Sequence, residues 1–205
     1  MNIPILDCDN TLYKSDVLFE VISERIIDFM KVKLGYPDNE SVHEVRKSYW
    51  KDYGTTLAGL IRHNNVDPSD YLEYIHDLEL RDFVKPNPLV RKLLMSIPSK
   101  KVIMSNAPRK HVLEVLKILD ISDIPDRVYA IEEFNYDGKP FKSSYQYVLK
   151  ESNIKPEEGI MFDDFEQNLN GAKSVGLKTC LVGKPDSNGF DFQINDISEI
   201  LNVFM

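Results

Sequence analysis

Short apolar runs recur along the chain, and most of them are followed by a segment with helical spacing. The runs cover residues 3–6, 101–105, 127–131, 159–162 and 179–183. After the second run, Val112, Val115 and Leu116 recur on one face of a predicted helix. Strands that are apolar on both faces and alternate with helices are typical of a parallel sheet. We therefore predict an α/β fold built on a parallel sheet.

Residues 14–84 interrupt this alternation. They contain four consecutive helical patterns, at residues 16–35, 40–53, 55–65 and 68–80. Asp16 is predicted to cap the first helix and Gly35 to end it. The prolines of "VKPNP" disfavour helix and mark the return to the alternating pattern. The pattern thus predicts a helical insertion between the first strand and the rest of the sheet.

Composition and charge narrow the class of protein. The 205 residues are 42% hydrophobic and 28% charged, as in ordinary globular proteins. The net charge of −8, with both signs intermixed, argues against a nucleic acid polymer as partner, because such binding needs clustered basic residues. No apolar run approaches the roughly 18 residues that suggest a membrane span, so we expect no membrane partner. The sequence does not indicate an oligomeric state.

The N-terminal segment and the two cysteines indicate the same cellular compartment. The N-terminal segment has no basic stretch followed by an apolar region, so we do not expect a signal peptide. Cys8 and Cys180 each lie inside an apolar run, which predicts buried thiols in a reducing compartment. We therefore expect a cytoplasmic protein.

Polar side chains follow four of the predicted strands, at the sheet edge where ligands bind in open parallel sheets. They are Asp7 and Asp9 after the first run, Ser105 and Asn106 after the second, Lys139 after the third, and Asp163 and Asp164 after the fourth. Each group alone also fits an ordinary turn or helix cap. Together they place four carboxylates, one lysine and a hydroxyl–amide pair at one edge.

This combination of groups predicts a particular chemistry. Four neighbouring carboxylates repel one another unless a cation offsets them, and oxygen ligands suit Mg²⁺. A lysine and a helix N-terminus behind a serine can receive a phosphate dianion. One carboxylate can attack the bound phosphoryl group, and a second can protonate the leaving oxygen and then activate water. We therefore predict a hydrolase of small phosphorylated metabolites with Mg²⁺ as cofactor.

The same four segments resemble, in order, the signature motifs of the magnesium-dependent phosphatases of the haloacid dehalogenase superfamily. The segments are "DCDNTLY", "IMSNA", "GKP" and "MFDDFEQN". The resemblance covers nearly the whole chain. It implies a Rossmann-like parallel-sheet core domain, residues 1–13 and 85–205, with an inserted all-helical cap domain, residues 14–84.

The resemblance also implies roles for the residues of the first and last motifs. Asp7 is the nucleophile and a metal ligand, and Asp9 is the general acid and base. Asp9 also gives its backbone carbonyl to the metal, and Thr11 helps to hold the loop. Asp164 is the side-chain metal ligand of the last motif, with Asp163 supporting it directly or through water.

The middle motifs are implied to bind phosphate. Ser105 and Asn106 hydrogen-bond the phosphoryl oxygens, and Lys139 neutralises the charge of the phosphate and the nucleophile. Lys142 is a rival for the role of Lys139. His111 lies on the helix after the second motif and could approach the site, although we favour a structural or surface role for it.

A narrower resemblance concerns the substrate. "DNTLY", "YGTTLAGL" and "SNAPRKHV" are similar to the pyrimidine 5′-nucleotidase-like branch, which implies a nucleoside 5′-monophosphate such as UMP or CMP. Gly54, Thr55 and Thr56 would then contact the substrate, although the same turn also fits a plain helix N-terminus capped by threonine. The alternatives are a phosphatase of another metabolite such as a sugar phosphate, a phosphomutase, and a non-catalytic phosphate-binding regulatory protein.

Overall fold

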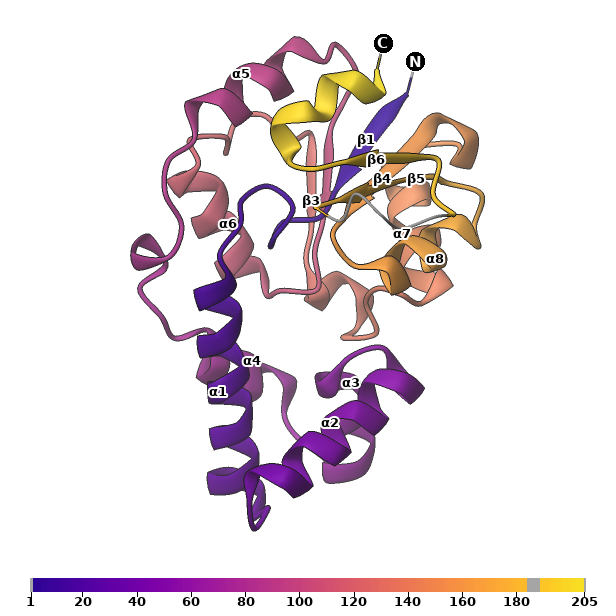
Figure 1. Ribbon diagram of the computed structural model, residues 1–205. Coiled ribbons are helices and arrows are strands. Elements are labelled where there is room, and N and C mark those ends of the chain that lie inside the picture. The colour runs from indigo at the N-terminus through magenta and orange to yellow at the C-terminus, as the bar shows by residue number, and fades with distance from the viewer. Residues whose placement is uncertain (1, 184–188, 205) are drawn as a thin grey trace. The chain divides into compact units, whose positions relative to one another are not determined.

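The computed structural model describes residues 2–183 and 189–204. The chain divides into two compact units, which are coloured along the sequence in Figure 1. The first unit, which we call the sheet unit, comprises Met1–Lys14 and Val84–Met205. The second, which we call the helical unit, comprises Ser15–Phe83. Each unit is described by itself.

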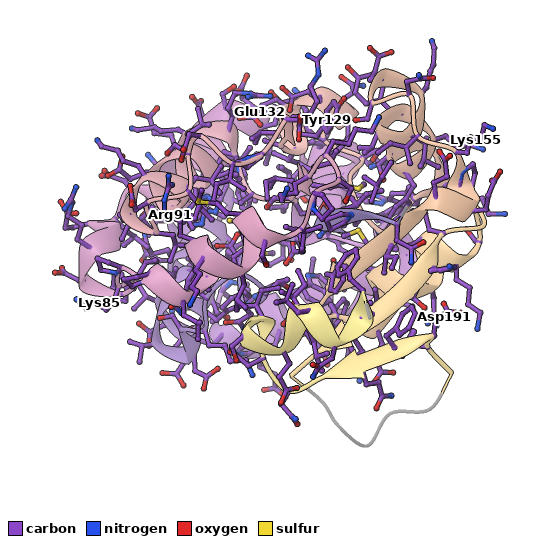
Figure 2. All side chains as sticks on the ribbon, turned by 90° about the horizontal axis from the view of Figure 1, so that it is seen from above. Lys85, Arg91, Tyr129, Glu132, Lys155 and Asp191 are labelled. Atoms are coloured by element: carbon purple, nitrogen blue, oxygen red, sulfur yellow. The ribbon has the colours of Figure 1, made fainter. Side chains whose placement is uncertain are left out.

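The sheet unit is built on a six-stranded parallel sheet with the strand order β3-β2-β1-β4-β5-β6. The strands are β1 Ile3–Leu6, β2 Val102–Met104, β3 Arg127–Tyr129, β4 Gly159–Asp163, β5 Lys178–Val182 and β6 Phe192–Ile194. The first five fall on the five apolar runs of the sequence, so the predicted α/β fold is confirmed. The edge strand β6 carries no comparable apolar run, and Asp191, at its start (Figure 2), accepts hydrogen bonds from the backbone and hydroxyl of Thr179 at 2.8 and 2.9 Å.

The order of the strands brings the sequence motifs together. The chain steps outward from β1 to β2 and β3, then returns to place β4 on the other side of β1. Leu6 of β1 is therefore in register with Ile103 of β2 and with Phe162 of β4. Ligands of open α/β sheets bind at such a reversal, beyond the carboxyl ends of the strands. The polar segments that follow β2, β1 and β4 consequently share one edge.

Helices cover both faces of the sheet. They are α5 Pro88–Ser96, α6 Arg109–Ile118, α7 Lys142–Glu151 and α8 Glu166–Lys173, with the 3-10 helices η2 Ile131–Phe134, η3 Pro156–Glu158 and η4 Ile197–Val203. Helix α5 packs against η4, α7 packs against α8, and Figure 1 shows these pairs on opposite faces. All residues of β1, β2 and β4 are buried as a result, which explains why their sequences are apolar on both faces.

The helical unit consists of α1 Asp16–Leu34, α2 Asn39–Tyr53, α3 Thr56–Asn64 and α4 Pro68–His76, followed by the 3-10 helix η1 Leu80–Asp82. The N-cap of α1 is Ser15, whose hydroxyl accepts a hydrogen bond from the Leu18 amide at 3.3 Å, and not Asp16 as the sequence suggested. Asp16 instead lies in the first turn, where its negative charge interacts favourably with the helix dipole. Gly35 ends α1 in the left-handed conformation, as predicted. Among the described residues, no helix has both the length and the apolar character that a membrane crossing requires.

Candidate active site

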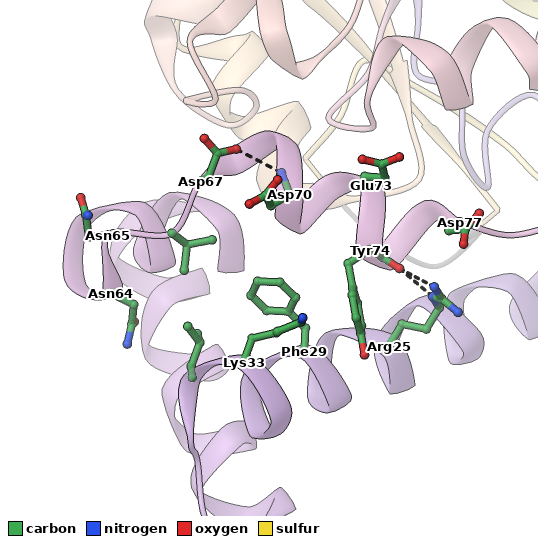
Figure 3. A pocket seen from close by; sticks show the side chains of 12 residues that line it. Arg25, Phe29, Lys33, Asn64, Asn65, Asp67, Asp70, Glu73, Tyr74 and Asp77 are labelled. Carbon is green, nitrogen blue, oxygen red and sulfur yellow. Dashed lines mark hydrogen bonds between the residues drawn. The ribbon is translucent and has the colours of Figure 1, made fainter.

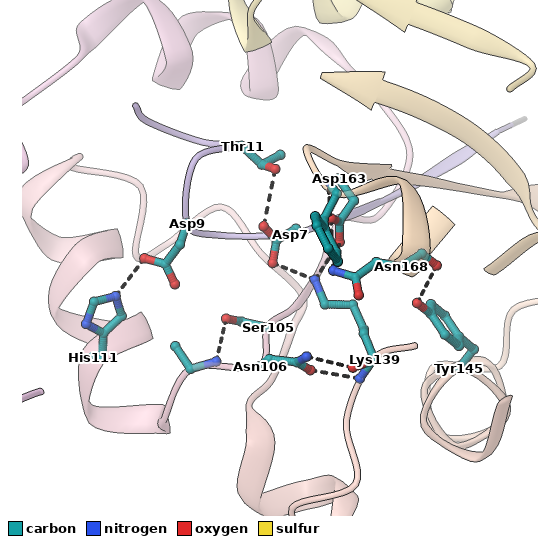
Figure 4. Close-up of polar contacts among 12 residues, drawn as sticks. Asp7, Asp9, Thr11, Ser105, Asn106, His111, Lys139, Tyr145, Asp163 and Asn168 are labelled. Atoms are coloured by element: carbon teal, nitrogen blue, oxygen red, sulfur yellow. Dashed lines mark hydrogen bonds and ion pairs between the residues drawn. The ribbon is translucent and has the colours of Figure 1, made fainter. Parts of the chain in front are cut away.

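The first motif forms a closed loop at the end of β1. The amide of Asp7 donates to the carbonyl of Phe162 at 2.9 Å, which keeps the Asp7 backbone paired with β4. The Leu12 amide donates to the Cys8 carbonyl at 2.9 Å, and the Thr11 hydroxyl donates to Asp7 Oδ2 at 3.2 Å (Figure 4). These contacts fix the buried Asp7 carboxylate at the edge of the sheet. Thr11 holds the loop in the way that the motif implied.

A buried lysine joins two of the carboxylates. The Lys139 side chain is only 1% exposed, and its Nζ lies 2.6 Å from Asp7 Oδ1 and 2.7 Å from Asp163 Oδ2 (Figure 4). Lys142, the rival residue, is the first residue of α7 and is exposed. The geometry therefore favours Lys139 as the lysine of the site.

The loop that carries Lys139 is held by the second motif. The Asn106 side chain donates from Nδ2 to the Lys139 carbonyl and accepts at Oδ1 from the Lys139 amide, both at 2.8 Å. Asn106 thus supports the lysine backbone, a role that the sequence did not indicate. Ser105 follows β2 directly, and its hydroxyl accepts a hydrogen bond from the Ala107 amide at 3.0 Å. Both residues lie in the same cluster as Asp7 and Lys139 (Figure 4).

Gly138 permits this pairing because it has no side chain. A Cβ atom at this position would lie 2.1 Å from Asn106 Oδ1 and 2.7 Å from Cδ1 of Ile131. We predict that Gly138→Ala displaces Asn106 and with it Lys139, lowering kcat/KM for an aryl phosphate by about 10²-fold. Steady-state kinetics would measure the loss, with Ser143→Ala as a control because that side chain is exposed on α7. Unchanged kinetics in Gly138→Ala would contradict the proposed support of Lys139.

Three of the carboxylates form a cluster that could hold a metal ion. One side-chain oxygen from each of Asp7, Asp163 and Asp164 lies within 4.8 Å of the others, and the first two residues are buried. Asp163 is oriented by the Phe165 amide at 2.9 Å and by Asn168 Nδ2 at 3.0 and 3.1 Å. Grouped carboxylate oxygens are the ligands that Mg²⁺ prefers, so the residues present fit this ion.

The charges of the cluster are only partly offset. Burial raises the pKa of Asp7 well above its ordinary value; Lys139 opposes this, while Asp163, Asp164 and Asp9 add to it. Burial would lower the pKa of Lys139, but the carboxylates of Asp163 and Asp7 raise it above its ordinary value. The lysine is thus held as a cation, and a further positive charge would favour the ionised form of Asp7.

Asp9 has two partners that the sequence interpretation missed. Its Oδ1 accepts a hydrogen bond from the Tyr13 hydroxyl. The same oxygen lies 2.7 Å from His111 Nε2 (Figure 4). Burial lowers the pKa of His111, but the charge of Asp9 and its hydrogen bond raise it above the ordinary value overall. Tyr13 follows Asp9 by four residues, and His111 lies in the first turn of the helix that starts after the second motif. That position near the sheet edge was the available signal.

The three residues proposed for substrate contact belong to the helical unit, at the turn between α2 and α3. Gly54 ends α2 in the left-handed conformation with φ of 71°. Thr55 caps α3, its hydroxyl accepting a hydrogen bond from the Ala58 amide at 3.1 Å, as the plain helix-cap interpretation predicted. Thr56 is 4% exposed, and its hydroxyl has no hydrogen-bond partner in the described part of the chain.

The helical unit also contains a pocket of about 600 Å³ (Figure 3). Arg25, Phe29 and Lys33 of α1 line one side, and Arg25 donates to the Tyr74 carbonyl at 2.5 and 2.9 Å. Acidic residues of the α4 region line the other side, namely Asp67, Asp70, Glu73 and Asp77. None of the predicted site residues lines this pocket.

The parallel sheet and the acidic cluster at its carboxyl edge define the class of protein. The chain belongs to the haloacid dehalogenase-like hydrolases, whose family pattern matches residues 2–176. This confirms the resemblance to the superfamily, but it does not distinguish the nucleotidase branch.

Three curated relatives are 25–30% identical to this chain. Phosphate metabolism protein 8 of Saccharomyces cerevisiae is 30% identical over 83% of this chain, which spans 58% of that protein's length. A phosphorylated carbohydrates phosphatase of Thermotoga maritima is 25% identical, covering 87% of this chain and 83% of that protein. A glyceraldehyde 3-phosphate phosphatase of Pyrococcus furiosus is 27% identical, covering 84% of this chain and 77% of that protein.

Solved structures agree on the fold. A haloacid dehalogenase-type phosphatase from Thermococcus onnurineus superposes with a TM-score of 0.66 at 20% identity, covering 100% of this chain and 98% of that one. L-2-haloacid dehalogenase from Xanthobacter autotrophicus superposes with a TM-score of 0.62 at 14% identity and the same coverage. At these identities the likeness extends to the fold alone.

Proposed function

We propose that the chain is a Mg²⁺-dependent phosphomonoester hydrolase that forms an aspartyl-phosphate on Asp7. The observation that carries this proposal is the buried Asp7 carboxylate, held 2.6 Å from Lys139 Nζ inside the acidic cluster at the end of β1. The names of two curated relatives, both phosphatases of small phosphorylated compounds, support it.

In the first proposed step, an oxygen of Asp7 attacks the phosphorus of the bound monoester. The new bond joins that oxygen to phosphorus, the bond from phosphorus to the leaving oxygen breaks, and Asp9 gives its proton to the leaving oxygen. In the second step, water attacks the phosphorus while Asp9 removes a proton from it. The bond to Asp7 then breaks and inorganic phosphate is released.

The other groups of the site stabilise charge. Lys139 offsets the negative charge of the phosphoryl oxygens and Ser105 donates a hydrogen bond to them. Asn106 binds the same group or keeps Lys139 in place. Mg²⁺ would be held by Asp7, Asp164 and the Asp9 carbonyl, with Asp163 as support, and when bound it supplies positive charge beside the phosphoryl group.

The proposed substrate is a small phosphorylated metabolite. We favour a nucleoside 5′-monophosphate of the pyrimidine type on the motifs of the sequence, with a sugar phosphate as second candidate on the names of the relatives. The helical unit, residues 14–84 in the sequence assignment, is proposed as the cap. Gly54, Thr55 and Thr56, at the turn between α2 and α3, are proposed to contact the substrate.

The location and partners are proposed from the same features. Both cysteines are buried free thiols, which fits the cytoplasm. The acidic net charge of −8 does not favour a nucleic acid polymer as partner.

Metal removal tests the proposed function. We predict that 4-nitrophenyl phosphate is hydrolysed with Mg²⁺, that chelation by EDTA lowers the rate by about 10²-fold or more, and that added Mg²⁺ restores it. Asp164→Asn should raise the Mg²⁺ concentration needed for half-maximal rate. Full activity in EDTA would contradict the metal requirement, and absence of activity with Mg²⁺ would favour a regulatory protein.

A panel of phosphorylated metabolites, scored by kcat/KM, tests the substrate. Nucleoside monophosphates that score no better than sugar phosphates would remove the nucleotide assignment. Release of inorganic phosphate without a second phosphorylated product would exclude a phosphomutase.

A further inference from the structure

The Asp9 carboxyl is held by side chains from two separate elements. Tyr13 lies on the same loop as Asp9, and His111 lies on α6, 102 positions further along the chain. Tyr13 is 8% exposed and His111 is 4% exposed. Both hydrogen bonds are made to the same oxygen, Oδ1. Asp9 is therefore fixed in direction by two buried groups.

We propose that Tyr13 and His111 are positioning residues that hold Oδ1 of Asp9 and so orient its carboxyl group for proton exchange with the leaving oxygen. The proposal rests on the proposed role of Asp9 as general acid and base. Two hydrogen bonds to one oxygen hold the carboxyl group through that atom. The two contacts also restrict rotation of the carboxyl group, which preserves the orientation that proton transfer needs.

Tyr13 and His111 contact a different carboxyl group from the one that Lys139 contacts at the nucleophile. Lys139 joins Asp7 to Asp163, whereas Tyr13 and His111 both contact Oδ1 of Asp9. A change in Tyr13 or His111 should therefore affect the proton transfer by Asp9 more than the attack by Asp7. The two functions can be distinguished through the basicity of the leaving group.

The experiment compares two substrates in the full-length protein with Mg²⁺. 2,4-Dinitrophenyl phosphate has a weakly basic leaving group that departs without a proton, whereas glycerol 2-phosphate has an alkoxide that needs one. We expect Tyr13→Phe to lower kcat/KM for the glycerol ester by about tenfold and His111→Ala by about 10²-fold. Both should change kcat/KM for the dinitrophenyl ester by less than about threefold, and the loss should lie in kcat rather than in KM.

Two further variants serve as a control and as a conservative replacement. Tyr129→Phe is the matched control, because Tyr129 (Figure 2) is equally buried and its hydroxyl pairs instead with Ser152 at 3.0 Å. Tyr129→Phe should leave kcat/KM for both esters unchanged. His111→Gln retains a donor and should recover part of the activity on the glycerol ester; if His111→Ala fails to fold, this variant and Tyr13→Phe carry the test.

The outcomes separate this inference from the proposed function. Equal losses on both esters in Tyr13→Phe and His111→Gln, in an otherwise active protein, would overturn the positioning role and leave the phosphatase proposal standing. A wild-type protein that hydrolyses neither ester would overturn both. Losses confined to the glycerol ester would support the inference.

Discussion

Asp7→Asn is expected to abolish hydrolysis of 4-nitrophenyl phosphate, lowering kcat/KM by about 10⁴-fold or more. The amide has nearly the shape of the carboxylate, but its oxygen is a poor nucleophile and carries no charge. Lys139 retains its contact with Asp163 in this variant, at 2.7 Å in the wild-type structure. The substitution also removes one charge from a buried acidic cluster. The protein should stay folded, although the loss of one of the two ion pairs of Lys139 should lower its thermal midpoint.

Two measurements make this prediction specific to Asp7. Acid quenching of the wild type during turnover should leave phosphate covalently bound to the peptide that contains Asp7, and the variant should carry none. Asp120→Asn is the matched control, since it makes the same chemical change at an exposed carboxylate. Retained activity in Asp7→Asn, or phosphate on a different peptide, would remove Asp7 as the nucleophile.

The sheet and its motifs could be predicted because each depends on local sequence. Five apolar runs gave five strands, and in β1, β2 and β4 burial on both faces leaves almost no polar position. Asp7, Ser105 and Asp163 lie at or directly after strand ends, and parallel strands bring their carboxyl ends to one edge. The topology then places these residues together without knowledge of any individual contact.

The contacts that orient the site could not be predicted in the same way. The pairing of Asn106 with the Lys139 backbone joins positions 33 apart, and that of His111 with Asp9 joins positions 102 apart. The sequence shows that His111 lies on a helix, but not that its ring reaches the first loop. The predicted N-cap residue of α1 was wrong by one position, because Ser15 and Asp16 are both favoured N-cap residues.

The second large effect concerns stability, and it arises from the buried Lys139. Lys139→Met preserves the length of the side chain but removes the positive charge between Asp7 and Asp163. Two buried carboxylates are then left without their partner, and breaking a buried ion pair in this way typically costs about 3–5 kcal/mol. We expect the free energy of unfolding to fall by about that amount, measured by urea denaturation, together with loss of phosphatase activity. Lys142→Met is the control, because that lysine is exposed.

A double-mutant cycle identifies the charge as the cause. In the wild type, Asp163→Asn should destabilise the protein, because it breaks one ion pair of Lys139. In the Lys139→Met background the same change should be stabilising, because it removes one of two uncompensated charges while the Asn side chain can still accept from the Phe165 amide. Mg²⁺ should likewise raise the thermal midpoint of Lys139→Met more than that of the wild type, since the ion would replace the missing charge. Additive losses in the cycle would show that Lys139 stabilises the site through packing rather than through its charge.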